Sequence, residues 1–324
     1  MRMGPVAAII ALLSSASAVA QAPTAPAPFV AGLPLGVTTD GKRTPISANV
    51  TVYGAIVSAE SCSYDAARDL IVVVNRGADQ KQAPNDGFVS LLKPDGSVHT
   101  PRWIGATRDG LVLNQPFGSD IRNGKLYLAD SDGDTADGAP RVAVLRMFDM
   151  ASGAPAGEVK VPDSPWFNDI AVAADGTVYA TQTGSPDGKV PMRLYKITAG
   201  GEASVLIDGA PLSLPNGVAM DNKGNIVVVN IGDDAVLTFS PDGKLIATEH
   251  AAQSGSDGLV ILPDGTKYVS SVRLGGVSRI RPGKPAELIA TGIPAAASMC
   301  YAAKANELVI PMNQNSALAF IKLR

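Results

Sequence analysis

The sequence predicts an all-β protein, a six-bladed β-propeller with four-stranded antiparallel blades around a central channel. Three observations predict it. Gly and Pro are abundant, with 33 and 24 residues in a chain of 324, the apolar runs are short and rich in Val, Ile and Leu, and one strand–turn–strand pattern recurs along the chain. Gly and Pro divide a chain into short strands joined by turns, and a repeat of roughly 40 to 50 residues is typical of propeller blades.

The repeat is the strongest of these observations. Six segments share a polar or small pair, an apolar strand, a tight turn and a second strand, and successive segments begin 40 to 57 residues apart. Their first residues are Glu60, Phe117, Asn168, Asn216, Asp257 and Ala297. Residue pairs that tolerate positive φ separate strands within the repeats, at Asp95-Gly96, Asn123-Gly124, Asp175-Gly176, Asp242-Gly243 and Asp264-Gly265. We therefore expect one propeller over residues 40–324.

The first 39 residues are not expected to belong to the propeller. Residues 1–20 contain an early Arg2, an apolar run and small residues ending at Ala20, which is the order of a secretory signal cleaved after that residue. The apolar run is too short to cross a bilayer. We expect a periplasmic or secreted protein without a membrane span, in which residues 21–39 form a Pro-rich lead-in.

The repeats differ in length: the last one is short, and the first three carry insertions. The last repeat has room for only about three strands before Arg324, so a strand over residues 46–57 is expected to complete that blade and close the ring. The earlier repeats carry extra polar segments at residues 76–87, 131–140 and 183–191. Insertions of this kind form loops on one face of a repeat protein, often the binding face.

The charge balance excludes one class of partner. The chain has 27 Lys and Arg residues against 30 Asp and Glu residues, a formal net charge of −3. Nucleic-acid-binding domains carry a basic surface, so no nucleic-acid partner is expected. We expect a monomer that binds a small molecule.

Cys62 and Cys300 are the only cysteines, and they lie near opposite ends of the predicted propeller. In an exported protein they could form a disulfide that joins the two ends. They could equally be two buried thiols that pack as small apolar side chains. The sequence leaves these alternatives even, because it does not fix the geometry that a disulfide requires.

The first residues of the repeats are the candidate functional residues. Equivalent positions at the start of the innermost strands converge on the channel of a propeller, and four of the six carry side-chain oxygen: Glu60, Asn168, Asn216 and Asp257. Carboxylate and amide oxygens are the ligands of hard cations, Ca²⁺ above all. Asn and Asp also begin strands simply as good turn residues, but Glu60 does not fit that explanation.

This pattern resembles the family of senescence-marker-protein, gluconolactonase and strictosidine-synthase-like six-bladed propellers. The resemblance extends over the predicted mature chain and rests on motifs in the family's order: Glu60-Ser61, Phe167-Asn168-Asp169, Pro215-Asn216-Gly217 and Asp257-Gly258-Leu259. It implies a divalent cation, usually Ca²⁺, held by Glu60, Asn216 and Asp257. Asn168 then matches the Asn that completes the ligand shell or contacts substrate.

The resemblance also implies an activity, because family members hydrolyse lactones and, in some branches, organophosphates or other esters. A bound cation polarises a carbonyl oxygen and lowers the pKa of a nearby water. Asp257 is then the candidate general base, or the nucleophile in a phosphotriesterase-like version. Asp169 is a candidate supporting residue, although a turn carboxylate in solvent is an equal alternative.

The chain departs from the family pattern at two places. Sugar-lactonase members carry Arg two residues before the Asn that corresponds to Asn168, where this chain has Trp166. Trp166 and Phe117, with Phe167, therefore suggest a more apolar substrate, unless these rings only pack within the blades. The candidate substrate-binding residues are Phe117, Trp166, Asn168 and Asp169. The last repeat begins with Ala297-Ser298 and supplies no cation ligand.

Two functions remain open at this stage. The first is an exported calcium-dependent lactonase or esterase, and the second is a non-catalytic propeller that binds a ligand or a protein around a structural ion. The only histidines, His99 and His250, lie away from the starts of the repeats. A zinc site with His ligands and a Ser-His-Asp triad are therefore disfavoured.

Overall fold

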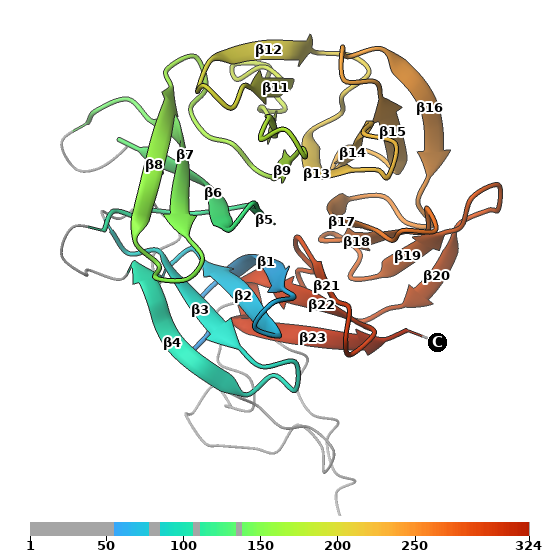
Figure 1. Ribbon diagram of the computed structural model, residues 1–324. Coiled ribbons are helices and arrows are strands. Elements are labelled where there is room, and N and C mark those ends of the chain that lie inside the picture. The colour runs from blue at the N-terminus through green and yellow to red at the C-terminus, as the bar shows by residue number, and fades with distance from the viewer. Residues whose placement is uncertain (1–54, 78–84, 106–110, 134–137, 324) are drawn as a thin grey trace, which may run out of the picture.

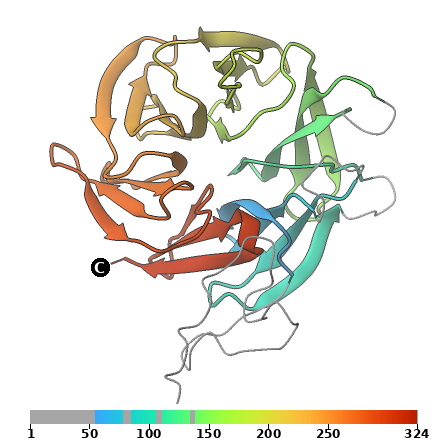
Figure 2. The same ribbon diagram turned by 180° about the vertical axis from the view of Figure 1, so that it is seen from behind.

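The computed structural model of the chain describes residues 55–77, 85–105, 111–133 and 138–323. Its strands form six antiparallel sheets that stand as blades in a ring, which confirms the predicted propeller (Figure 1; Figure 2 shows the ring from behind). The predicted signal segment 1–20, the lead-in 21–39 and most of the predicted strand 46–57 lie outside the described residues. None of the described residues forms a helix capable of spanning a membrane.

Each blade is built from consecutive strands, and the first strand of each is the innermost. Blade 1 contains β1 (Ala59–Asp65), β2 (Leu70–Asn75), β3 (Phe88–Leu92) and β4 (Val98–Gly105). Blade 2 contains β5 (Ser119–Arg122), β6 (Lys125–Asp132), β7 (Val142–Asp149) and β8 (Pro155–Val161). Blade 3 contains β9 (Ile170–Val172), β10 (Val178–Gln182), β11 (Arg193–Ile197) and β12 (Ala203–Asp208).

The second half of the chain repeats this layout. Blade 4 contains β13 (Pro215–Met220), β14 (Ile226–Asn230), β15 (Ala235–Phe239) and β16 (Leu245–His250). Blade 5 contains β17 (Ser256–Ile261), β18 (Lys267–Ser271), β19 (Val277–Ile280) and β20 (Glu287–Ala290). Blade 6 contains β21 (Cys300–Ala302), β22 (Glu307–Met312) and β23 (Ala317–Lys322), with the short 3₁₀ helix η1 (Asn313–Asn315) before its last strand.

The turns within the blades follow the predicted turn residues. Asn123 and Gly124, between β5 and β6, have φ values of 51° and 72°, and Gly176 and Gly265 turn the equivalent hairpins of blades 3 and 5 with φ of 87° and 84°. Positive φ at these positions is what a tight hairpin needs, and Gly and Asn adopt it at least cost. The predicted pairing of first and second strands is therefore correct in these blades.

The hydrophobic core lies between neighbouring blades. Val72, Val74 and Leu91 of blade 1, for example, share one buried cluster with Leu126 and Leu128 of blade 2. Five further buried clusters fill the other spaces around the ring, so each blade buries both faces against its neighbours. This packing explains why the second strands read as continuous apolar runs, such as the fully buried β2 and β14.

A disulfide joins the first and last blades. Cys62 of β1 and Cys300 of β21 are bonded, with their Cα atoms 5.4 Å apart, although 238 positions separate them in the sequence. The alternative of two free thiols is therefore wrong. Both cysteines belong to innermost strands, and β1 and β21 are brought together only when the ring closes, so the bond links the two ends of the propeller beside its channel.

Candidate functional site

The six predicted start positions occupy equivalent places in the structure. The backbone N–H of Phe117 donates to Ala129 O at 2.8 Å, that of Asn168 to Thr181 O at 2.7 Å, and that of Ala297 to Pro311 O at 2.9 Å. In each case the acceptor is on the second strand of the same blade. The innermost strands therefore begin on one face of the ring, which we call the entry face. The three polar insertions follow β2, β6 and β10, whose ends lie at this same face.

Three of the candidate ligands lie at irregularities of their strands. The pairing of β1 with β2 shifts register between Ala59 and Ser61, at Glu60. The pairing of β13 with β14 shifts between Pro215 and Val218, and that of β17 with β18 between Ser256 and Leu259. These shifts contain Asn216 and Asp257. A β-bulge bends its strand and re-aims a side chain, and bulges are common beside active sites.

Glycines allow the blades to approach closely at this face. A Cβ atom on Gly217 would lie 2.2 Å from the carbonyl oxygen of Asp257, and a Cβ atom on Gly258 would lie 2.6 Å from the backbone nitrogen of Met299. Each glycine directly follows a start position, and the atom that it approaches belongs to the next blade. The close approach brings the Asn216 and Asp257 side chains, from adjacent blades, within reach of each other.

Glu60, Asn216 and Asp257 form a buried polar group at the entry face. Their exposed fractions are 5%, 1% and 4%. Asn216 Nδ2 donates to Asp257 Oδ2 at 3.3 Å, and Glu60 receives a hydrogen bond from Asn313 Nδ2 of blade 6. Asn216 Oδ1 and Asp257 Oδ1 are buried without a hydrogen-bond partner among the described residues. Two orphaned oxygens in one buried cluster are costly unless something binds them.

The carboxylates in and beside this group repel one another electrostatically. Burial raises the pKa of Asp257 well above its usual range, and the nearby carboxylates of Glu60 and Asp169 raise it further. Burial also raises the pKa of Glu60, while the Arg76 guanidinium, 4.0 Å from Glu60 Oε2, opposes that shift. Buried acids that repel one another are stabilised by a bound cation, which favours their ionised forms.

The donor set fits a hard divalent cation. Glu60 and Asp257 supply two negative charges, and the orphaned oxygens of Asn216 and Asp257 supply neutral and charged oxygen donors without a competing hydrogen bond. The described residues contain no cluster of three or more His, Cys, Asp or Glu side chains arranged to hold a metal ion. A cation at this place therefore depends on the Asn amide oxygens, which suit Ca²⁺ better than Zn²⁺.

Asn168 is less completely enclosed than the other three candidates. It lies two residues before β9, next to Asp169, and its side chain is half-buried. Its carbonyl oxygen accepts a hydrogen bond of 2.8 Å from the backbone N–H of Gly118, which ties blade 3 to blade 2 at the channel. Asn168 thus lies at the equivalent position in the ring, with an amide side chain that is half-buried.

The predicted aromatic residues divide into two groups. Phe167 is fully buried and packs edge-to-face on Tyr195, with ring centroids 5.3 Å apart, so it belongs to the core of blade 3. Phe117 and Trp166 are only half-buried. The guanidinium of Arg141 lies over both rings, 5.8 Å from the centroid of Phe117 and 5.4 Å from that of Trp166. The guanidinium of Arg76 also lies over Phe117, 4.6 Å from its centroid, so guanidinium groups cover part of both rings.

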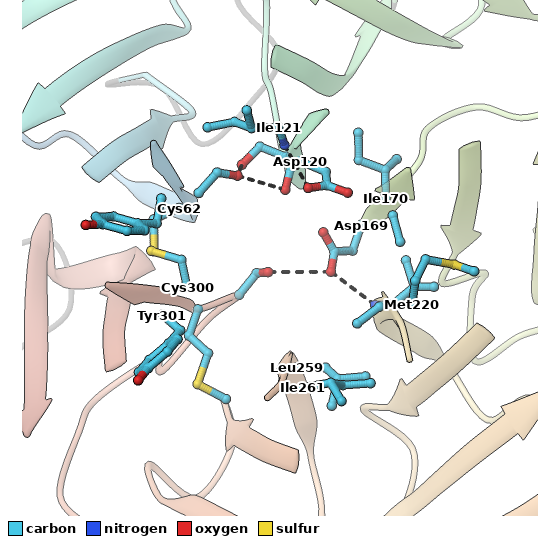
Figure 3. A pocket seen from close by; sticks show the side chains of 18 of the residues that line it. Cys62, Asp120, Ile121, Asp169, Ile170, Met220, Leu259, Ile261, Cys300 and Tyr301 are labelled. Carbon is cyan, nitrogen blue, oxygen red and sulfur yellow. Dashed lines mark hydrogen bonds between the residues drawn. A yellow bond between two sulfur atoms is a disulfide. The ribbon is translucent and has the colours of Figure 1, made fainter. Parts of the chain in front are cut away.

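Asp169 faces a cavity in the channel. Its Oδ2 accepts hydrogen bonds from Val218 N at 3.1 Å and Ser298 Oγ at 3.5 Å, and Figure 3 shows it projecting among the innermost strands. Burial raises the pKa of Asp169 to about 7, against the lowering effect of the Val218 and Ile170 N–H groups. The alternative of a turn carboxylate in solvent is therefore wrong.

The cavity has a volume of about 260 Å³, and residues of all six innermost strands line it. None of the four candidate ligands is among its lining residues. Its lining residues follow the start positions along each strand, so the cavity lies farther along the channel than the candidate ligands. Asp169 and Ser298 are the lining residues that directly follow a start position in the sequence.

Sequence reasoning missed three residues of the entry face: Arg76, Arg141 and Asn313. All three lie just outside a strand, at the ends of β2 and β22 and before β7. Segments outside the strands carry no periodic signal, so the repeat pattern marks only the insertion that begins at Arg76 and does not single out any of the three residues. The only signal in the sequence is their place in the repeat. Each residue follows a second strand or precedes a third strand, at the end of that strand that lies on the entry face.

The two histidines lie on the outermost strands of their blades and not on the innermost strands that carry the candidate residues. His99 belongs to β4 and His250 to β16, the outermost strands of blades 1 and 4, and both side chains are exposed. His250 Nδ1 lies 3.0 Å from Asp234 Oδ1. Both histidines thus lie away from the starts of the repeats, as the sequence predicts.

Comparisons with known proteins point to one family. The family model described as the SMP-30/gluconolactonase/LRE-like region matches residues 141–312, more than half of the chain. No curated protein sequence matches the chain.

Solved structures share the fold at low sequence identity. A gluconolactonase from Xanthomonas campestris has a TM-score of 0.59 at 18% identity, over 84% of this chain and 87% of that one. A protein of unknown function from Bacteroides thetaiotaomicron has a TM-score of 0.57 at 13% identity, over 82% and 69% of the two chains. Virginiamycin B lyase from Staphylococcus aureus has a TM-score of 0.55 at 12% identity, over 89% and 87%.

Proposed function

The chain belongs to the SMP-30/gluconolactonase/LRE-like family, and from this premise we propose that it is a calcium-dependent hydrolase of lactones or esters. The observation that carries the proposal is the buried group at the entry face, in which Asn216 Oδ1 and Asp257 Oδ1 have no hydrogen-bond partner among the described residues. The gluconolactonase with the same fold supports the choice of a lactone as substrate class.

Glu60, Asn216 and Asp257 would hold the cation, with Asn168 as a fourth ligand or a substrate contact. A divalent ion bound there would polarise the substrate carbonyl and lower the pKa of a neighbouring water. Asp257 would take the proton from that water as general base while the water attacks the carbonyl carbon. On a phosphotriester, Asp257 would instead attack phosphorus and expel the alcohol or phenol group, and water would then hydrolyse the phosphorylated Asp257. Asn216 Nδ2 donates to Asp257 Oδ2 and so orients the carboxylate for either role.

We further propose that the protein works outside the cytoplasm. The disulfide between Cys62 and Cys300 supports this location, because disulfides persist in the periplasm and outside the cell and are rare in the reducing cytosol. Residues 1–20 would then act as the export signal.

A lyase reaction like that named for virginiamycin B lyase is a weaker candidate. A variant of that lyase in which one histidine is replaced by alanine is described as catalytically inactive. In this chain His99 and His250 are exposed on the outermost strands, so neither can act on a substrate at the channel. The residues present therefore favour hydrolysis.

The test is hydrolysis of a panel of lactones, aryl esters and an organophosphate, with calcium and with a chelator. Calcium-dependent turnover is expected in the wild type, and a loss of at least about 100-fold is expected in Asn216→Ala and Asp257→Ala. Asp242→Ala, at an exposed turn between β15 and β16, is the matched control and is expected to retain activity. Turnover that survives the chelator or both substitutions would contradict the proposal. Absence of turnover with calcium binding intact would favour the binding propeller.

A further inference from the structure

Blades 1 and 6 meet beside the candidate ligand Glu60. We call this contact the closure seam and define it as residues 58–62 of blade 1 with residues 295–300 and 311–316 of blade 6. Figure 1 shows β1 lying against β21 and β22, where the ring closes. The disulfide between Cys62 and Cys300 belongs to the seam, two residues after Glu60. The candidate site thus includes a residue of the seam itself.

Asn313 holds one oxygen of the Glu60 carboxylate. It directly follows β22, the second strand of blade 6, and is the first residue of η1. Its Nδ2 donates a hydrogen bond to Glu60 Oε2, and the Arg76 Nη1 atom is 4.0 Å from the same oxygen. Among the described residues, no hydrogen bond goes to Glu60 Oε1. Oε1 is therefore the oxygen that is left to meet a cation.

The Asn313 amide is fixed in the orientation that this contact requires. The Ser58 hydroxyl donates to Asn313 Oδ1 at 3.1 Å, so Nδ2 is the end that faces Glu60. The backbone N–H of Asn313 donates to Ala295 O at 3.2 Å, and that of Ser58 donates to Ser316 Oγ at 3.1 Å. Because the amide oxygen accepts and the amide nitrogen donates, both polar ends of this side chain are assigned by the network around it.

The main chain of Glu60 is tied to the same blade. The backbone N–H of Ser298 donates to Glu60 O at 3.2 Å. The register shift between Ala59 and Ser61 interrupts the regular pairing of β1 with β2 at this residue. Glu60 is also buried, so contacts across the closure seam, and not solvent, determine where its carboxylate lies.

We propose that Asn313 is a positioning residue of the candidate cation site: it holds Oε2 of Glu60 across the closure seam and so presents Oε1 to the ion. This inference rests on the proposed calcium-dependent function. It gives the last blade a part in a site to which its start position supplies no ligand. A carboxylate that is already held by one oxygen loses little side-chain freedom when the other oxygen binds an ion.

The first experiment is a calorimetric titration of the protein with calcium, in the wild type and in Asn313→Leu. Leucine is similar in size to asparagine but donates no hydrogen bond. Residues that hydrogen-bond to a metal ligand commonly contribute about 10- to 100-fold to metal affinity, so a loss of about 10-fold or more is expected. Gln314→Leu is the matched control, because it makes the same change at the next residue of η1, where the side chain is exposed. Its calcium affinity should be unchanged.

The second experiment is a double-mutant cycle with Glu60→Ala, which separates positioning from general damage to the fold. Asn313→Leu should weaken calcium binding about 10-fold in the wild-type background and less than about 2-fold once Glu60 is absent. A purely structural role would weaken binding by the same factor in both backgrounds. Urea denaturation in calcium-free buffer confirms that each variant is folded.

Each outcome decides the inference. Calcium affinity that is unchanged in Asn313→Leu, or lowered equally in both backgrounds, would overturn the positioning role even if the protein hydrolyses esters with calcium. A loss of affinity that depends on Glu60, in a protein that turns over no ester or lactone, would support the positioning role and count against the hydrolase. Absence of calcium binding by the wild type would overturn both.

Discussion

At the scale of single residues, the glycines that follow the start positions shape the candidate site as much as the candidate ligands do. Gly118, Gly217 and Gly258 follow three of the start positions, and at each of them a Cβ atom would collide with the next blade. The sequence contains two of these glycines in the pairs Asn216-Gly217 and Asp257-Gly258, and the repeat pattern correctly placed both pairs at the start of an innermost strand. Which side chains then meet was not predictable, because contacts between blades depend on the ring as a whole.

Gly217→Ala tests the close approach of blades 4 and 5. The added Cβ atom would lie 2.2 Å from Asp257 O and 2.9 Å from Val229 Cγ2, so the backbone that carries Asp257 must shift. We expect a loss of about 1–3 kcal/mol in the free energy of unfolding and a weaker affinity for calcium. Urea denaturation and calcium titration measure the two effects. Gly200→Ala, whose nearest neighbour would be Thr198 Oγ1 at 3.6 Å, is the control that should change neither.

Asp120 gives a prediction about pH. Burial raises the pKa of Asp120 to about 6, although its Oδ2 accepts a hydrogen bond of 2.7 Å from Val172 N. The folded state therefore keeps this proton up to about pH 6, whereas the unfolded chain releases it near pH 4. The stability that Asp120 contributes is fully present below pH 4 and is lost as the pH rises to 6.

Asp120→Asn should remove that dependence. Relative to this variant, the wild type should lose up to about 3 kcal/mol of unfolding free energy between pH 4 and pH 6, as urea denaturation at each pH can measure. Asp242→Asn is the control, since a hydrogen bond from Ser240 lowers the pKa of that exposed carboxyl and keeps its titration below the window. A constant difference between wild type and Asp120→Asn across the window would refute the account of Asp120.

At the scale of secondary-structure elements, the sequence predicted the innermost strands well and the site-shaping irregularities poorly. Glu60, Asn216 and Asp257 are the second residues of their innermost strands, and the other three start positions lie two or three residues before theirs. The register shifts at Glu60, Asn216 and Asp257 were not predictable, because register is decided by pairing with a partner strand. Arg76 and Arg141 were missed for a related reason, since they lie in connections between strands.

Hydroxyl groups on the second strands tie neighbouring blades together. Ser270 of β18 accepts a hydrogen bond of 2.7 Å from Gly258 N in its own blade and donates one of 2.9 Å to Ala297 O in blade 6. Ser270 is fully buried, so its replacement would leave both backbone groups without this partner. One hydroxyl thus fixes the backbone directly after Asp257 to the adjoining blade.

Ser270→Ala is expected to lower the unfolding free energy by about 1–3 kcal/mol, the cost of leaving buried backbone groups unsatisfied. Chemical denaturation measures the loss. Ser204→Ala on the outer strand β12 is the matched control, because that exposed hydroxyl makes one long hydrogen bond of 3.4 Å to Lys196 O. Equal stability of the two variants would show that the bridge between blades 5 and 6 contributes nothing measurable.

At the scale of the whole molecule, closure of the ring was the feature least accessible to sequence reasoning. The number of blades followed from the period of the repeats, but the pairing of Cys62 with Cys300 did not. Their separation of 238 positions is bridged only when blade 6 returns to blade 1. Blade 6 itself shows three strands within the described residues, so the predicted contribution of residues 46–57 stays a prediction.

Opening the disulfide should weaken the closed ring. A cross-link over a loop this long restricts the unfolded chain strongly, and its loss is expected to lower the unfolding free energy by about 3–5 kcal/mol. Guanidinium denaturation with and without a thiol reductant measures this loss. The double variant Cys62→Ala/Cys300→Ala should be less stable and insensitive to the reductant. Equal stability of the oxidised and reduced wild type would contradict this role.

The most direct test of the account is calorimetric titration of the protein with calcium. One calcium site is expected in the wild type, with affinity reduced at least about 100-fold in Asn216→Ala and Asp257→Asn. No change is expected in Asp242→Asn, whose carboxyl lies at an exposed turn. Circular dichroism confirms that each variant is folded. Calcium binding that is unchanged in both site variants, or absent from the wild type, would contradict the assignment of Glu60, Asn168, Asn216 and Asp257 as a cation site.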